Sequence, residues 1–491
     1  MDMYQFYDIR TFMRRVNQEG VPFPTKRVYK TDKDVKLMMT KLSRFDYRSR
    51  INFDIDYGVR GLTLPLEYER NSVLLVNKRS DYEDFNILSD MFVEETRMKA
   101  MLFGRKHSPH SYFRAFPEKV AREAMRKVRI ISPKSLTEAL YTLPQVKECT
   151  SFRPGTMIAL IQLLYGMDHG NIHVLDPSSG WGDRLIASIA AGVRYTGVDP
   201  NSAMVDRYAD IIQFFDASEG RTMLAVPFEE AKLENEYDLV FTSPPYFDLE
   251  SYSSEDTQSI KKFTRENVWT QQFLLPYVEK AWDAIKPGGF MAINIGQRQG
   301  QHYVEDMVAH INSLSAEYLG IIAHATEGLY VKAQPIFVWR KPFDTDIYAE
   351  EDLDGKQLSL RAMTVEDSAV FVASMKGKKT KSKKNNVKGL SKPCKLLSAY
   401  WGDELVGFIG YSSMESTTRN ILRIRVIKHK GLVEDTLIRL FLIRFNYALV
   451  MAIAKANSPA VAMFEGLSVT HMPAKKLTIR GTSYMGYDLF A

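Results

Sequence analysis

The pattern of apolar and polar residues changes twice along this 491-residue chain. In the first 140 residues, apolar side chains recur at helical spacing over residues 87–101 and 117–128, and residues 73–76 form a short apolar run. Helical spacing predicts amphipathic helices, whereas a short apolar run predicts a strand. We therefore expect a mainly helical N-terminal region over residues 1–140, to which no motif assigns a role.

From residue 150 the pattern becomes strand, glycine-bearing turn, helix and strand. Strands that alternate with helices are typical of a doubly wound α/β sheet. The sequence thus predicts an α/β domain over residues 141–343. The expected elements are a helix over residues 184–191 and strands over residues 172–175, 195–198, 238–242 and 289–295.

The last third of the chain has a third pattern. Residues 344–355 are acidic and lack apolar periodicity, so we expect a linker over residues 344–356. Beyond it, residues 357–491 are predicted to form an α+β domain. The expected elements are strands over residues 358–363 and 421–426, hairpins over 397–411 and 477–487, and helices over 436–445 and 458–464.

Composition excludes several classes of protein. The chain is 45% hydrophobic and 25% charged, as in globular proteins. It has no run of about 18 apolar residues and no apolar block near its start, so we expect neither a membrane span nor secretion. Cys149 and Cys394 are far apart and lack metal-ligand spacing, which argues against a disulfide framework and against a metal site. The net charge of +6 is compatible with a polyanionic partner, and the oligomeric state is left open.

The first candidate site is the turn after the strand at residues 172–175. Its glycines would let the backbone approach a ligand at the carboxyl end of the strand, and an acid about twenty residues later could accept both hydroxyls of a ribose. The spacing is not that of a dinucleotide turn, and an acid before the glycines suits a cationic ligand better than a pyrophosphate. The predicted nucleoside-binding residues are Asp176, Pro177, Ser178, Gly180, Gly182, Asp199 and Pro200.

The second candidate site follows the strand at residues 238–242. Ser243, Pro244, Pro245 and Tyr246 form a stiff turn, because each proline fixes its own backbone and lacks an N–H. The carbonyl groups of such a turn stay free to face a pocket. We therefore expect this turn to hold a polar ligand group.

These two motifs together resemble those of the amino-methyltransferases, which include the DNA adenine-N6 and cytosine-N4 enzymes. The (Asp/Asn/Ser)-Pro-Pro-(Tyr/Phe) motif of that family matches residues 243–246, and its cofactor motif resembles residues 176–182. The resemblance implies a Rossmann-like class I methyltransferase core and S-adenosyl-L-methionine as cofactor, with Phe152 packed over the methionine end. The late turn of this fold resembles residues 286–289.

The resemblance also implies roles in catalysis. The Ser243 side chain and the Pro244 carbonyl would accept the two hydrogens of an exocyclic amine, Pro245 would stiffen the turn, and Tyr246 would stack on the flipped base. Phe247 could line the target pocket, and Asp248, Glu250 and Tyr252, which follow on a predicted loop, could line it or be solvated. The substrate is expected to be cytosine N4 or adenine N6 in DNA, while RNA and a glutamine amide remain within reach of the same chemistry.

The C-terminal segment resembles the GNAT-type N-acetyltransferases in the order of its predicted elements, with local matches at residues 360–367, 406–409 and 457–460. In that family a glycine-bearing loop at a helix start binds the pyrophosphate of acetyl-CoA. The matching positions here are Lys428, Gly431 and Val433, and valine stands where a small residue is usual. Acetyl-CoA binding and a role as a nucleic-acid reader therefore both remain open.

Seven lysines fall within residues 376–388, and this loop contains no acidic residue. Such a run could neutralise phosphates without reading sequence, so Lys378, Lys379, Lys383 and Lys384 are predicted to contact DNA. A solvated insertion would have the same composition. The leading hypothesis is a cytoplasmic DNA amino-methyltransferase of a bacterium or a phage-infected host. The alternatives are a bifunctional modifier with an acyltransferase domain and a non-catalytic nucleic-acid-binding or structural protein.

Overall fold

The structure is a computed structural model. It describes residues 4–46, 50–52, 73–77, 85–165, 172–233, 236–298, 300–314, 316–326, 333–342, 347–353, 356–362, 395–401, 404–414, 417–426, 450–455, 475–479 and 482–489. The chain divides into two compact units. The first comprises Met1–Pro65, Leu74–Ala159 and Gly170–Lys341, and the second consists mainly of Pro342–Ala491.

The first unit is built around a mixed sheet whose strands follow the order β1-β2-β10-β11-β9-β7-β4-β5-β6. Strands β6, β5, β4, β7 and β9 are parallel, and β11 is antiparallel to both β9 and β10. These seven strands confirm the α/β, Rossmann-like expectation. Their bounds are β4 His173–Asp176, β5 Arg194–Val198, β6 Arg221–Leu224, β7 Tyr237–Thr242, β9 Ile285–Asn294, β10 Glu317–Thr326 and β11 Gln334–Arg340.

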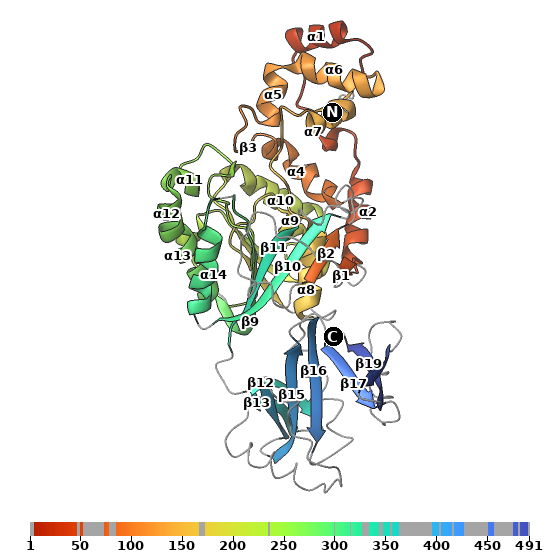
Figure 1. The fold of residues 1–491 in the computed structure, drawn as a ribbon. Coiled ribbons are helices and arrows are strands. Elements are labelled where there is room, and N and C mark those ends of the chain that lie inside the picture. Colours follow the sequence, from red (N-terminus) through yellow and green to blue (C-terminus); the bar gives the residue numbers. More distant parts are fainter. Residues whose placement is uncertain are drawn as a thin grey trace. The chain divides into compact units, whose positions relative to one another are not determined.

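Helices cover both faces of this sheet, and Figure 1 shows α9 and α10 on one side with α13 and α14 on the other. Because both faces are covered, most residues of the central strands are buried, and in β4 all four are. This explains why these strands read as continuous apolar runs. The helices are α8 Pro154–Tyr165, α9 Asp183–Ala191, α10 Val205–Phe214, α13 Leu275–Asp283 and α14 Tyr303–Ser313.

The expected late turn at residues 286–289 lies within β9 and forms an irregularity there. Gly288 has a φ of +78°, and the register with β7 shifts between Tyr237 and Leu239. A Cβ atom at Gly289 would lie 2.7 Å from the carbonyl oxygen of Asp238. Gly289 is therefore required by the close approach of β7 and β9, and Gly288 by its positive φ. A sequence pattern does not distinguish such an irregularity in a strand from a turn.

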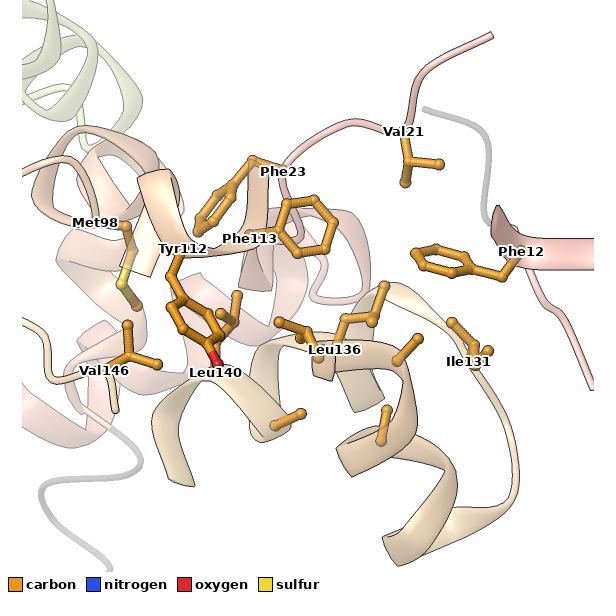
Figure 2. Packing of buried hydrophobic residues seen from close by; sticks show 14 residues of the cluster. Phe12, Val21, Phe23, Met98, Tyr112, Phe113, Ile131, Leu136, Leu140 and Val146 are labelled. Carbon is orange, nitrogen blue, oxygen red and sulfur yellow. The ribbon is translucent and has the colours of Figure 1, made fainter. Parts of the chain in front are cut away.

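The N-terminal region is mainly helical, as predicted, and it has a hydrophobic core of its own (Figure 2). Residues from widely separated helices meet in this core, including Phe12, Phe113 and Leu136. Side-chain caps start several helices: Thr31 and Asp34 form a capping box, as do Ser132 and Ser135. The helices are α1 Ile9–Gln18, α2 Asp32–Ser43, α4 Ile87–Arg97, α5 Pro109–Ala115, α6 Pro117–Val128 and α7 Pro133–Thr142.

This region also contributes to the central sheet. Strand β2 (Val73–Asn77) was expected from its apolar run, and it lies beside β10 with β1 (Ile51–Asn52) at the edge. A second connection is the two-stranded ladder between β3 (Met101–Leu102) and β8 (Glu250–Ser251). The helix expected over residues 87–101 accordingly ends at Arg97, before β3 begins.

The second unit contains one sheet with the order β12-β13-β14-β15-β16-β17-β19-β18. Its ladders are antiparallel except for the parallel pair β16 and β17. The predicted strand and hairpin positions are confirmed. The strands are β12 Ile347–Leu353, β13 Lys356–Ala362, β14 Lys395–Trp401, β15 Glu404–Met414, β16 Thr417–Val426, β17 Val450–Lys455, β18 Lys475–Ile479 and β19 Thr482–Leu489.

One expectation for this unit needs correction. Most of the predicted linker is strand β12, which pairs with β13 at the edge of the sheet. Charged residues are common on edge strands because they discourage further pairing, so an acidic composition did not mean irregular structure here. The lysine loop at 376–388, the positions Lys428, Gly431 and Val433, and both expected helices lie outside the described residues. The acetyltransferase-like assignment stays a prediction.

Within the described residues, no helix is long and apolar enough to cross a membrane.

Candidate functional site

A cavity of about 870 Å³ opens at the carboxyl ends of β4, β5, β7 and β9. The chain passes from β4 to β5 on one side of the sheet and later returns to β7 on the other side of β4. This reversal is the topological switch point, where open α/β sheets bind their ligands. The predicted residues that line the cavity are Phe152, Pro177, Ser178, Gly180, Asp199, Pro200, Ser243, Pro245 and Tyr246.

The turn after β4 is held by backbone geometry. Gly180 has a φ of +58°, and its N–H donates to the carboxylate of Asp199 at 2.8 Å. The backbone N–H of Asn201 donates to the other oxygen of Asp199 at 3.0 Å. Burial raises the pKa of Asp199 to about 6, although both of these hydrogen bonds oppose the shift. The carboxylate is thus fixed in the cavity wall with lone pairs left for a ligand's hydroxyl groups.

Gly182 has a structural role in the same turn. It precedes α9 with a φ of +81°, and a Cβ atom there would lie 3.0 Å from the Cδ1 atom of Ile211. A side chain would therefore be strained and crowded at once. Gly182 is not among the residues that line the cavity, so its contribution is to shape the turn rather than to contact a ligand.

The structure revises the expected role of Asp176. This residue is fully buried and does not line the cavity, and its carboxylate accepts from Arg184 Nε at 2.7 Å and from the Tyr195 hydroxyl at 2.6 Å. The carboxylate is thus paired within the protein, and its contact with a cationic ligand stays a prediction. Arg184 lines the cavity instead, and its guanidinium lies 5.3 Å from the centre of the Phe152 ring. Sequence spacing could not reveal this internal ion pair.

Tyr277 on α13 connects the two motifs and was not predicted. Its hydroxyl lies 2.7 Å from Ser178 Oγ and 3.2 Å from Thr242 Oγ1. Ser178 belongs to the turn after β4, and Thr242 ends β7. The phenol therefore fixes the separation between the turn after β4 and the Ser-Pro-Pro-Tyr turn after β7.

The turn after β7 presents its serine and tyrosine to the cavity. The Ser243 hydroxyl lies 3.4 Å from the Tyr246 oxygen, and the Tyr246 hydroxyl donates to Asn294 at 3.2 Å (backbone oxygen) and 3.3 Å (Oδ1). Burial raises the pKa of Tyr246 to about 12, so the phenol stays protonated. Pro245 lines the cavity, whereas Pro244 is buried and does not. The expected contact of the Pro244 carbonyl with an amine stays a prediction.

Two further polar residues that line the cavity, Asn294 and His324, were not predicted from the sequence. Asn294 ends β9, and its Nδ2 donates to the Pro335 carbonyl oxygen at 2.9 Å and lies 3.1 Å from His324 Nε2. Burial and the nearby Arg153 lower the pKa of His324 to about 3. A histidine within the apolar run of β10 and an asparagine that ends the apolar run of β9 were the available signals.

Phe247 and Asp248 do not line the cavity. Phe247 is buried, its ring centre lies 5.6 Å from that of Trp269, and its φ of +39° is unusual for a bulky residue. Asp248 accepts from Arg298 at 2.5 and 2.6 Å, and Arg298 lies over the ring of Phe103. These two residues shape the loop after the turn. Glu250 and Tyr252, farther along the loop, do line the cavity.

The residues present fit a nucleoside cofactor. The volume is within the usual range for ligand sites, about 300–1,000 Å³. The Asp199 carboxylate can accept from a ribose diol, and a Cβ atom at Gly180 would approach nothing closer than 3.9 Å, so the turn leaves open space. Within the part of the chain that is described, no cluster of His, Cys, Asp and Glu could hold a metal ion. The four predicted lysines lie outside the described residues.

Solved structures with a similar fold include S-adenosylmethionine-dependent methyltransferases. An O-methyltransferase of this kind from Thermotoga maritima aligns with a TM-score of 0.26 and 11% identity, over 38% of this chain and 64% of that one, just under two thirds of its length. A candidate class I enzyme from Listeria monocytogenes gives 0.33 and 14%, over 64% and 90%. An rRNA methylase from Streptococcus thermophilus gives 0.27 and 11%, over 40% and 99%. No protein-family model and no curated protein matches the chain.

Proposed function

We propose that this chain transfers a methyl group from S-adenosylmethionine to the exocyclic amino nitrogen of cytosine (N4) or adenine (N6) in DNA. The proposal rests on one observation: residues of both motifs line the same cavity at the switch point. Gly180 and Asp199 lie on one side of it and Ser243 and Tyr246 on the other. Two turns that are about sixty residues apart in the sequence thereby form a single site.

The cofactor side would bind through Asp199, which accepts from the ribose hydroxyls, and through the open backbone at Gly180. Phe152 and Arg184 would lie near the amino acid end. When bound, S-adenosylmethionine supplies an electrophilic methyl group on its sulfonium. The residues of this side bind and orient, so they contribute by proximity rather than by acid–base chemistry.

The amine side would prepare the nucleophile. An exocyclic amine on an aromatic base is a poor nucleophile because its lone pair is delocalised into the ring. When Ser243 Oγ accepts one N–H, the nitrogen is drawn toward tetrahedral geometry and its lone pair becomes available. The N–CH3 bond would form as the sulfonium S–CH3 bond breaks, S-adenosylhomocysteine would leave, and the methylated nitrogen would lose one proton to water. The half-buried ring of Tyr246 would stack on the base, which must leave the duplex to enter the cavity.

DNA as the partner is supported by the composition of the chain rather than by its described contacts. The net charge is +6, and seven lysines fall within residues 376–388. Lysines in such a run would neutralise phosphates in a way that depends on salt and not on sequence. This part of the proposal stands apart from the chemistry of the cavity.

The test is incubation with labelled S-adenosylmethionine and single-stranded DNA, double-stranded DNA or RNA, followed by mass spectrometry of the digested nucleosides. N4-methylcytosine or N6-methyladenine in DNA is the expected product. Label in RNA alone would replace DNA as the substrate. Absence of label from every nucleic acid, with cofactor binding intact by calorimetry, would contradict the proposal.

A matched pair of serine variants separates catalysis from binding. Ser243→Ala removes the acceptor of the amine, and we expect turnover to fall by about 10²–10³, as for other single hydrogen-bonding groups aimed at a reaction centre. Ser251→Ala removes the same atoms from an exposed position in β8 and should leave turnover unchanged. Cofactor affinity should be unchanged in both. A non-catalytic binder would be indifferent to either change.

A further inference from the structure

The hydrogen bonds behind Ser243 form a chain whose direction can be worked out from its far end. The chain runs from Ser243 through Tyr246 and Asn294 to His324, and its members come from the turn after β7, from β9 and from β10. Asn294 and His324 are 2% and 8% exposed, so water does not compete freely for their polar groups. Each link therefore has a defined donor and acceptor.

The orientation of the Asn294 amide is fixed by a main-chain carbonyl. One hydrogen of Nδ2 is donated to the Pro335 oxygen at 2.9 Å, and a carbonyl oxygen can only accept. The amide nitrogen must therefore face Pro335 and His324, and Oδ1 must face Tyr246. The second hydrogen of Nδ2 points at His324 Nε2, 3.1 Å away.

His324 Nε2 must then be an unprotonated acceptor, with the proton of the neutral ring on Nδ1. The buried position and the charge of Arg153 lower the pKa of His324 to about 3, which keeps the ring neutral near pH 7. In a protonated imidazole Nε2 would carry a hydrogen, and this hydrogen would face a hydrogen of Asn294 Nδ2 with no acceptor between them. The neutral ring is consequently required by the contact as well as favoured by burial.

The other end of the chain follows from the first. Both oxygens of Asn294 that face Tyr246 can only accept, so the single hydroxyl proton of Tyr246 is committed to them. The Tyr246 oxygen can then only accept from Ser243 at 3.4 Å. The Ser243 hydroxyl proton then points to Tyr246, and because Ser243 lines the cavity, its remaining lone pairs can accept from a group bound there.

We propose that Asn294 and His324 are positioning residues that make Ser243 an acceptor and thereby select targets that donate an N–H. This inference rests on the proposed function and deepens it, because it concerns the same site. The exocyclic groups of cytosine and adenine donate N–H, whereas thymine O4 and guanine O6 only accept. A base that offers an oxygen would meet the lone pairs of Ser243 and leave them unpaired, which polar sites reject strongly.

The first test concerns the direction of the chain and needs no catalysis. Nitrogen-15 NMR of histidine-labelled protein distinguishes the two neutral tautomers and the cation, and the signal of His324 is identified among the nine histidines by its loss in His324→Gln. The neutral Nδ1–H tautomer is expected from pH 6 to pH 8. A protonated ring, or a proton on Nε2, would overturn the inference even if the protein methylates DNA.

The second test uses two substitutions of the same residue. Glutamine at position 324 can place an oxygen near the Nε2 position and accept from Asn294, whereas leucine cannot. We expect His324→Leu to lower kcat by about tenfold, the cost of roughly one hydrogen bond, and His324→Gln to restore most of it. The affinity for S-adenosylmethionine and the melting temperature serve as controls. Equal losses in both variants would indicate a merely structural role and contradict the inference.

The third test measures selectivity by binding. With S-adenosylhomocysteine present, single-stranded oligonucleotides that differ at one central base are compared by fluorescence anisotropy, cytosine against thymine and adenine against hypoxanthine. The wild type should prefer the amino base in at least one of the two comparisons, and His324→Leu should reduce that preference. If the wild type transfers no methyl group but shows this preference, the proposed function fails and the inference about the acceptor stands. Equal affinity within both comparisons would contradict the inference.

Discussion

The two sides of the cavity hold their reactive groups in different ways. On the cofactor side, Asp199 is fixed by the backbone N–H groups of Gly180 and Asn201, within a turn shaped by glycines with positive φ. On the amine side, Ser243 is fixed by a chain of side chains that ends at His324. The hydrogen bonds that hold Asp199 come from the backbone, so they belong to the fold itself. The hydrogen bonds that hold Ser243 come from side chains, so single substitutions can remove them one at a time. We therefore expect variants of the two sides to differ in kind, with losses of stability and cofactor affinity on the first and losses of turnover on the second.

The largest effect is expected from the ion pair beneath the cofactor-side turn. Arg184→Met leaves the buried carboxylate of Asp176 without its cation, and removing one partner of a buried pair costs about 3–5 kcal/mol. The free energy of unfolding, measured by urea denaturation, should fall by this amount. Arg122→Met is the control, because the pair that Arg122 forms with Glu118 is exposed and should be worth less than about 1 kcal/mol. Similar losses in the two variants would show that the turn does not depend on its buried pair.

The next effect concerns the ribose-binding carboxylate. Asp199→Asn keeps the shape of the side chain but removes its charge, and hydrogen bonds to a charged group contribute about 1.5–3 kcal/mol. The dissociation constant for S-adenosylmethionine, measured by calorimetry, should rise by roughly ten- to a hundredfold. Asp206→Asn, at an exposed position of α10, should leave it unchanged. An unchanged constant in Asp199→Asn would remove this residue from the cofactor site.

The same carboxylate predicts an effect of pH with opposite signs for binding and folding. The pKa of Asp199 is raised to about 6, so protonation below that pH should weaken the cofactor complex, by up to tenfold for each further pH unit. Because the folded-state pKa lies above the ordinary value of 3.8, this group stabilises the fold at acidic pH and loses that contribution as pH rises through about 6. Calorimetry across pH 5 to 8 tests the first effect. In Asp199→Asn the dependence near pH 6 should disappear, and its persistence would assign it to another group.

The contrast between the two sides also explains what the sequence could reveal. Strand, glycine and acid follow one another within residues 172–199, so the backbone-anchored side was visible as a local pattern. Two residues predicted there, Asp176 and Gly182, do not line the cavity, and the pairing of Asp176 with Arg184 and Tyr195 depends on packing beneath the turn. Local patterns record which backbone conformations are needed but not which buried charges meet.

The amine side was visible only at Ser243–Tyr246. Asn294, His324 and Tyr277 come from β9, β10 and α13, and only the folded sheet brings them to the motif. Strand β2 is a similar case, since its apolar run predicted a strand but could not name β10 as its neighbour. Contacts between distant segments depend on how whole helices and strands pack together. A single sequence indicates where the helices and strands lie but not which of them are neighbours.

The smallest effect is expected from Tyr246, in the middle of the hydrogen-bond chain. Tyr246→Phe keeps the aromatic ring against the target but removes the oxygen that accepts from Ser243 at 3.4 Å. Because this change and His324→Leu interrupt the same chain of hydrogen bonds, kcat should fall by about tenfold, as in His324→Leu. Cofactor affinity should match the wild type, and the free energy of unfolding should fall by about 1 kcal/mol, because the buried Asn294 oxygens lose one hydrogen-bond donor. Steady-state kinetics beside calorimetry separates the outcomes: a loss of a hundredfold or more would mean that the phenol itself contacts the reacting amine, and a weaker cofactor complex would mean that the two sides are coupled through Tyr277.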